Sequence, residues 1–183
     1  MIDYRLGNDV SGPVTLEIKD SKGTVVRRYA STDPIAPPDP KLKIPRYWVQ
    51  PPRVLPGAPG LHRFFWDMHL EPLQGVDPAY PMTAVFQKTA AQPTGPWAVP
   101  GNYSLVLSAG GKSFTQALTV KMDPRVKSSA VDLVKQFDLS KALYDLRAAL
   151  QPIGGRLGDR FGRRKLMLAA LAYFGIEIGR AHV

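Results

Sequence analysis

Apolar and polar residues alternate along several short segments of the chain, which is the pattern of β-strands with one buried face. Residues 14–19 alternate regularly and residues 24–29 less so, and a four-residue connection lies between them. Asp20 at the start of this connection and Gly23 at a position that favours positive φ predict a hairpin loop with a bulge. Residues 2–6 add one more predicted strand upstream.

The most hydrophobic strand is predicted at residues 60–68, where the two-residue period places Phe64, Trp66 and Met68 on one face. A turn at residues 109–112 joins two more strands, at 103–107 and 114–121, and a short strand at 82–86 is a further candidate. The same period places Phe114, Leu118 and Val120 on one face of the last strand. Five or six short strands with turns between them predict an antiparallel β-sandwich.

The hydrophobic period changes after residue 125. Ser128 or Ser129 can cap a helix that has Asp132 in its first turn. Leucines then recur at spacings of four, three and four, and a second apolar strip runs beside them. The leucines are Leu139, Leu143, Leu146 and Leu150, and the second strip is Leu133, Phe137 and Tyr144. We therefore expect an amphipathic helix from about residue 129 to 150.

Composition changes this picture in two places. Fifteen of the 18 prolines lie between Pro34 and Pro100, which predicts long extended loops laid over the sandwich. The chain has no cysteine, so disulfides and thiolate metal sites are excluded. We assign no cofactor and no metal. Residues 1–5 do not have the basic and apolar regions that open a signal peptide, so an exported protein would carry this chain as an internal fragment.

The net charge of +9 does not indicate a nucleic-acid-binding protein. Residues 151–183 hold six basic and two acidic residues, which leaves 18 against 13 in the first 150. The basic residues of that body are scattered and are not interleaved with aromatic side chains, as phosphate-tracking surfaces are. We expect no nucleic-acid partner.

Four motifs in order resemble a known module: Val-Thr-Leu-Glu-Ile at 14–18, Gly-Leu-His-Arg-Phe-Phe-Trp-Asp at 60–67, Pro-Gly-Asn-Tyr at 100–103 and Leu-Thr-Val-Lys-Met-Asp-Pro-Arg at 118–125. Residues 1 to about 148 resemble the immunoglobulin-like C-terminal region of secreted bacterial Asp-box (BNR) or sortilin-like β-propeller proteins, often labelled glycosyl-hydrolase-like. The Pro-Gly-x-Tyr turn is also similar to immunoglobulin-like modules of the flagellar-hook-cap type. The resemblance implies an Ig/fibronectin-like fold beside a propeller partner in an exported protein. It transfers no catalytic residue, because no Asp-box repeat occurs in the chain.

The candidate chemical groups are few. His62, His69 and His182 show no spacing that converges on a metal, so packed or surface histidines are favoured. Asp67 beside Trp66 could have a raised pKa, but a glycosidase needs a second carboxylate that nothing identifies, and turn bonding is favoured. Tyr47, Trp48 and Trp97 could form a sugar-stacking platform. Packing against prolines is favoured, because no Asn/Asp/Arg cluster accompanies them to bind hydroxyl groups.

The last 33 residues do not match the body. Gly155, Asp159, Arg160, Gly162, Arg163 and Arg164 resemble the loop motif between the second and third membrane helices of major facilitator superfamily transporters. A spanning helix needs about 20 apolar residues. Lys141, Asp145 and Arg147 interrupt the upstream flank, and residues 166–176 give only 11 uncharged positions. Membrane insertion is not expected. Residues 177–183 resemble a translated sequencing adapter.

These observations predict a mainly β chain: an Ig/fibronectin-like sandwich with long Pro-rich loops at 1–126, an amphipathic helix at 127–150, and a foreign tail at 151–183. We expect a non-catalytic accessory or interaction module of an exported propeller protein. One alternative is a carbohydrate-binding module. A second alternative takes the tail literally, as a fragment of a major facilitator superfamily transporter.

Overall fold

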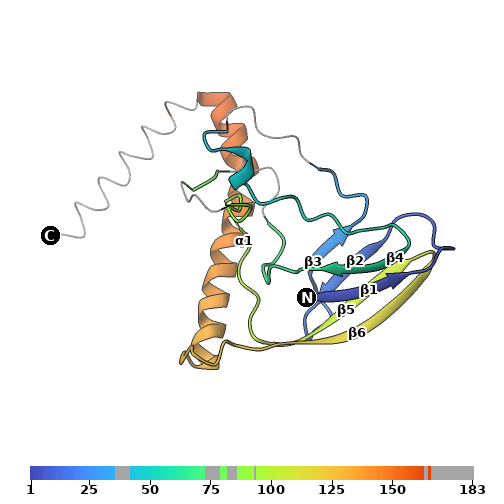
Figure 1. The fold of residues 1–183 in the computed structure, drawn as a ribbon. Helices are drawn as coiled ribbons and strands as arrows, with labels where there is room; N and C mark the ends of the chain where they lie inside the picture. The colour runs from blue at the N-terminus through green and yellow to red at the C-terminus, as the bar shows by residue number, and fades with distance from the viewer. Residues whose placement is uncertain (36–41, 73–78, 82–85, 93, 163–164, 166–183) are drawn as a thin grey trace. The chain divides into compact units, whose positions relative to one another are not determined.

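A computed structural model describes residues 1–35, 42–72, 79–81, 86–92, 94–162 and 165 (Figure 1). The chain divides into two compact units, Met1–Ser140 and Lys141–Val183, so the boundary falls inside the C-terminal helix. All the strands belong to the first unit. The architecture is mostly antiparallel β, with six strands in two sheets and one helix after them.

The larger sheet has the strand order β3-β2-β5-β6, and every neighbouring pair in it is antiparallel. The smaller sheet pairs β1 with β4, also antiparallel. Figure 1 shows the two sheets in separate layers, with β1 beside β4. The strand bounds are β1 Ile2–Leu6, β2 Thr15–Lys19, β3 Val25–Ala30, β4 Gly60–Phe64, β5 Gly101–Ala109 and β6 Lys112–Val120.

The loop between β2 and β3 confirms the predicted hairpin. Gly23 has φ +82° and its N–H donates to the Asp20 carbonyl at 3.0 Å. The Asp20 carboxylate accepts from the backbone N–H groups of Lys22 and Thr24, both at 2.9 Å. A bulge was expected with this loop, and the register shifts next to it, between Ile18 and Lys19. Local turn chemistry therefore fixes this pairing.

The loop between β5 and β6 has only two residues, Gly110 and Gly111, with φ of 55° and 75°. Two consecutive positive φ angles are the mark of a type I′ turn, whose twist matches that of the flanking strands. Glycine takes this conformation at the lowest cost because it has no Cβ. The predicted hairpin is confirmed, and its strands are longer than predicted.

The strand predicted at 60–68 is too long. β4 ends at Phe64, and Met68 has a left-handed φ of 60° and is 45% exposed. Phe64 and Trp66 are buried as expected, but Met68 does not share their face, because the backbone turns after Trp66. Most of the candidate strand at 82–86 lies outside the described residues.

Both sheets contribute to one hydrophobic core. The smaller sheet supplies Ile2, Tyr4, Leu6 and Phe64, which alternate with exposed residues along their strands. The larger sheet supplies Leu16, Ile18 and Tyr29, and the Tyr29 ring meets Phe64 edge-on at 4.7 Å. Loop residues close the core, among them Leu55 at 1% exposure. The regular alternation noted at residues 14–19 agrees with the buried face of β2, where Leu16 and Ile18 are buried.

The helix α1 spans Ala130–Phe161. Ser129 is its N-cap: its hydroxyl accepts from the Asp132 N–H at 3.1 Å and donates to the Asp132 carboxylate at 2.7 Å. The predicted end at residue 150 is wrong by 11 residues. The helix continues through Pro152, Gly154 and Gly155. It ends before Gly162, whose φ of 82° is the left-handed conformation that ends helices. The leucine row of the helix is exposed, at 52% to 64%.

Candidate functional site

The candidate site is built on the segment that follows β4. The Trp66 ring is buried and lies 5.6 Å from Tyr103, and its Nε1 donates to the His69 carbonyl at 3.0 Å. The His69 N–H donates to the Asp67 carboxylate at 3.2 Å. This confirms turn bonding as the role of Asp67. The indole and the carboxylate together hold residues 66–69 in a tight turn.

Backbone hydrogen bonds then fix the segment on both sides. The N–H of Leu70 donates to the Pro96 carbonyl at 2.9 Å, and the N–H of Glu71 donates to Val26 of β3 at 3.1 Å. A Cβ at Gly95 would collide with the Leu70 carbonyl, so this close approach requires glycine. The two contacts place the Glu71 carboxylate beside the arginines of β3.

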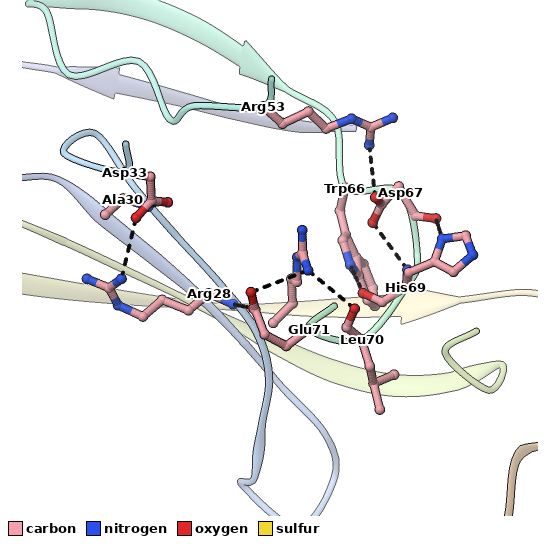
Figure 2. A network of polar contacts seen from close by, with 10 residues as sticks. Arg28, Ala30, Asp33, Arg53, Trp66, Asp67, His69, Leu70 and Glu71 are labelled. Carbon is pink, nitrogen blue, oxygen red and sulfur yellow. Dashed lines mark hydrogen bonds and ion pairs between the residues drawn. The ribbon is translucent and has the colours of Figure 1, made fainter. Parts of the chain in front are cut away.

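Three arginines and three carboxylates gather here, and we call them the arginine pocket: Arg27, Arg28, Arg53, Asp33, Asp67 and Glu71 (Figure 2). They surround a cavity of about 270 Å³ that is also lined by Tyr29, Tyr80 and residues 49–51. The six charges cancel.

The ion pairs in the arginine pocket are long. Arg27 Nη1 lies 3.5 Å from Glu71, Arg28 Nη1 lies 3.7 Å from Asp33, and Arg53 Nη1 lies 3.8 Å from Asp67. Arg27 and Arg53 also donate to the carbonyls of Leu70 and Phe65, at 3.3 and 3.1 Å. Half-exposed pairs of this length stabilise a fold by little. Each carboxylate also accepts from a backbone N–H: Glu71 from Arg28 at 3.4 Å, Asp33 from Ala30 at 2.6 Å and Asp67 from His69 at 3.2 Å.

Two buried polar atoms at the arginine pocket, Arg27 Nε and the Tyr29 hydroxyl, have no hydrogen-bond partner among the described residues. Tyr29 is 2% exposed, and burial raises the pKa of its hydroxyl. The Arg27 guanidinium lies 4.9 Å from the centre of the Tyr29 ring. Its charge opposes the rise in pKa, but the contact does not have hydrogen-bond geometry. A buried hydroxyl without a partner costs about 1–3 kcal/mol.

The aromatic residues predicted to stack on sugars fall into two places. Tyr47 and Trp48 meet edge-on at 6.0 Å in the short 3₁₀ helix Arg46–Trp48, and Tyr47 is 60% exposed. The Trp97 ring instead contacts the His69 ring, with the ring centres 3.8 Å apart and the planes tilted by 39°. The structure therefore does not join the three into one platform. It does place residues 49–51, which follow Trp48 directly, in the lining of the arginine pocket.

Trp97 borders a different and larger cavity within the first unit. This apolar cavity has a volume of about 740 Å³, and its lining includes Met68, Trp97, Val120, Met122, Leu133 and Phe137. The Trp97 side chain is 65% exposed, and Met68 and Met122 are 45% and 39% exposed. Leu133 and Phe137 come from the second apolar strip recognised in the sequence. Nothing in the residue pattern indicates that this strip lines an open cavity.

The histidines predicted to be packed or on the surface are in ring contacts. His62 lies 5.3 Å from Tyr4 and its Nε2 is 2.6 Å from the Ala58 carbonyl. His69 contacts Trp97, and His182 lies outside the described residues. Among the residues that the structure describes, no three His, Cys, Asp or Glu side chains are grouped so that they could hold a metal.

The transporter-like motif is only partly described. Gly155, Asp159 and Arg160 lie within α1, so this part of the motif is helical and not a loop as in the family it resembles. Gly162 ends the helix, and Arg163 and Arg164 lie outside the described residues. Across the described ranges, no helix is both long enough and apolar enough to cross a bilayer.

Comparisons with protein-family models, with curated proteins and with solved structures find no match to this chain.

Proposed function

We propose that residues 1–126 form a non-catalytic interaction module of an exported protein, with an Ig/fibronectin-like β-sandwich fold. The four-stranded order β3-β2-β5-β6 beside the β1-β4 pair supports this fold, because two antiparallel sheets share one core. The resemblance to the C-terminal regions of Asp-box and sortilin-like propeller proteins suggests the partner. That partner is the β-propeller domain of the parent protein.

The observation that carries the proposal is the apolar cavity beside Trp97. An exposed tryptophan, two exposed methionines and a concave apolar lining are the features of an interaction surface. An aromatic side chain of this size buries about 200 Å² when fully covered. Covering the exposed 65% of Trp97 would therefore contribute about 3 kcal/mol to binding.

The test begins with the genomic DNA that flanks the coding sequence. The proposal requires a reading frame with Asp-box repeats on its 5′ side, and the encoded propeller is then expressed and titrated with this chain. Trp97→Ala should weaken binding about 100-fold, because it removes the central aromatic contact. Phe86→Ala is the matched control, since Phe86 is 64% exposed and does not line the cavity. Equal losses in the two variants would refute the proposal.

A second candidate function is carbohydrate binding, and the arginine pocket favours it. From the sequence, the aromatic residues lacked a polar cluster that could bind hydroxyl groups. The structure supplies such a cluster next to the segment that carries Tyr47 and Trp48. Guanidinium groups donate and carboxylates accept, so together they match the two roles of a sugar hydroxyl. Tyr47 is exposed enough to stack on a sugar face.

Affinity electrophoresis in gels that contain neutral or acidic polysaccharides tests this second function. Retardation that is lost in Arg53→Ala and retained in Arg63→Ala would support it. Arg63 is a matched control because it also pairs with a carboxylate, Asp3 at 2.9 Å, and does not line the pocket. Migration unchanged by every polysaccharide would refute it.

We further propose that residues 151–183 are foreign to the module and that the chain is a chimera. The mismatch between the transporter-like motif and the β body supports this, as do the adapter-like residues 177–183. Amplification of source DNA across the codons for residues 140–183 decides the question. Recovery of the same continuous frame would show that the tail belongs to the gene.

A further inference from the structure

The smaller sheet is two strands narrower than the sheet with which it shares the core. Phe64 of β4 meets Tyr29 of β3, so β4 lies toward the β3 side of the larger sheet. Tyr4 and Leu6 of β1 line one groove with Leu107 of β5 and Phe114 of β6, so β1 lies toward the other side. The β1 edge that faces away from β4 is therefore on the side of β6.

Part of β6 is left uncovered as a result. Phe114, Leu118 and Val120 share a face, and they pair with Leu107, Tyr103 and Gly101 of β5. Val120 is 9% exposed and belongs to the core, whereas Phe114 on the same face is 62% exposed. A large aromatic side chain on the core side of the sheet is therefore mostly exposed. The uncovered part is the first half of β6.

One edge of β1 also has unpaired backbone groups, beside the uncovered part of β6. In an antiparallel pair, alternate residues turn their N–H and C=O groups away from the partner strand. Among the described strands, β1 pairs with β4 alone. The N–H and C=O groups of alternate residues of β1 therefore point away from β4 and toward the groove side. Unpaired strand edges are templates for a further strand. Here the free edge and the uncovered apolar face border one groove of about 340 Å³.

We propose that this groove accepts an extended peptide segment of a partner protein, which adds a third strand to the smaller sheet beside β1. The segment would place apolar side chains at alternate positions over Phe114, because successive side chains of a strand point to opposite faces. Arg5 and Lys112 line the groove against one acid, Asp9. Charge complementarity therefore selects a segment with acidic residues at its ends.

A second copy of this chain does not fit the groove. Suppose that β1 paired with β1 of a second copy across a two-fold axis. The larger sheet of the second copy would then have to pack against the second copy's β1, next to the groove of the first copy. Phe114 of β6 in the first copy already lines the groove beside β1, so that sheet would meet it there. A single extended segment has no such sheet beneath it. This surface is separate from the cavity beside Trp97, so the inference does not depend on the proposed function.

The probe is a fluorescent nine-residue peptide in which valine alternates with threonine and a glutamate stands at each end. We expect saturable binding to the full chain by fluorescence anisotropy. Hydrogen exchange should slow at the amides of residues 2–6. A peptide with the same side chains and every backbone nitrogen methylated should not bind, because it lacks the N–H donors that a strand needs. Equal binding of the methylated peptide, or no gain in protection of residues 2–6, would overturn the inference.

Variants of the protein give a second measurement. Phe114→Ala should weaken peptide binding by about tenfold, the loss typical of an interface aromatic residue. It should leave the urea midpoint nearly unchanged, because Phe114 is mostly exposed. Phe86→Ala is the control and should bind as the parent chain does. Equal binding by the Phe114 variant would overturn the inference, and so would concentration-dependent dimerisation that Phe114→Ala abolishes, since the occupant would then be a second copy.

Discussion

Removing the Tyr29 hydroxyl should stabilise the protein. Tyr29 is 2% exposed, and its ring packs against Phe64 in the core. Its hydroxyl is buried without a hydrogen-bond partner among the described residues. Tyr29→Phe keeps the ring contact and removes the polar atom that folding takes out of water. The substitution therefore separates the cost of the hydroxyl from the benefit of the ring.

The expected gain is about 1 kcal/mol in the free energy of unfolding. An unsatisfied buried polar group costs about 1–3 kcal/mol, and the lower end applies because the Arg27 charge lies close to the ring. Tyr4 is the matched control. Its hydroxyl donates to the Pro56 carbonyl at 2.6 Å, and Tyr4 is 8% exposed. Tyr4→Phe should therefore destabilise the protein by about 1 kcal/mol.

Urea unfolding followed by tryptophan fluorescence measures both variants at pH 7, with the slopes compared so that the midpoints can be converted to free energies. Opposite shifts of the midpoint are expected. If Tyr29→Phe destabilised the protein as much as Tyr4→Phe, the Tyr29 hydroxyl would have a hydrogen-bond partner. The arginine pocket would then contain one unsatisfied donor fewer.

Above pH 10 the two tyrosines have the same effect on the stability of the protein. Burial raises the pKa of Tyr4 to about 12 and raises that of Tyr29, so stability present below pH 10 is lost as pH rises toward 12.

Three further changes test the construction of the fold and the site. Gly95→Ala should lower the free energy of unfolding by about 2–3 kcal/mol, because its Cβ would collide with the Leu70 carbonyl; an unchanged urea midpoint would contradict that close approach. Ser129→Ala should cost about 1 kcal/mol of helix stability, seen as a smaller helical signal in circular dichroism on warming, whereas an identical melt would show that the cap is not needed. Asp3→Asn should make the free energy of unfolding fall less steeply as the pH is lowered. The hydrogen bond from Arg63 lowers the pKa of Asp3 below its ordinary 3.8, so its contribution is present above that value and is lost as pH falls through the lowered pKa. If the free energy of unfolding fell equally steeply with decreasing pH in the variant and in the parent chain, the Asp3–Arg63 interaction would be contradicted.

The hairpins could be predicted from the sequence because local residues determine them. Asp20 and Gly23 supply the side-chain acceptor and the positive φ of one loop, and Gly110 with Gly111 supplies the two positive φ angles of the other. The buried face of β2 followed from the simple alternation at residues 14–19. These signals act within a few residues, so a single sequence contains them.

The errors lie where distant residues decide the structure. The end of β4 depends on the turn that Trp66 and Asp67 make with His69. The end of α1 was placed too early because the change in composition at residue 151 was taken as a structural boundary. The positive φ at Gly162 is the stop that the backbone uses, and its glycine was visible in the sequence.

The arginine pocket was missed because no local pattern marks it. Arg27 and Glu71 are separated by more than 40 positions, and the backbone bond from Glu71 to Val26 brings them together. The open edge of β1 is hidden for the same reason, since its pairing with β4 joins residues about 60 positions apart. Both features arise from tertiary pairing, which the spacing of residue types does not show.

Titration calorimetry of this chain with the β-propeller that we propose to be encoded upstream of it measures the proposed interaction itself. We expect binding that Trp97→Ala weakens about 100-fold and that Phe86→Ala leaves unchanged. A flanking gene without a propeller, or a propeller that releases no heat with the folded chain, would contradict the claim that this is an interaction module.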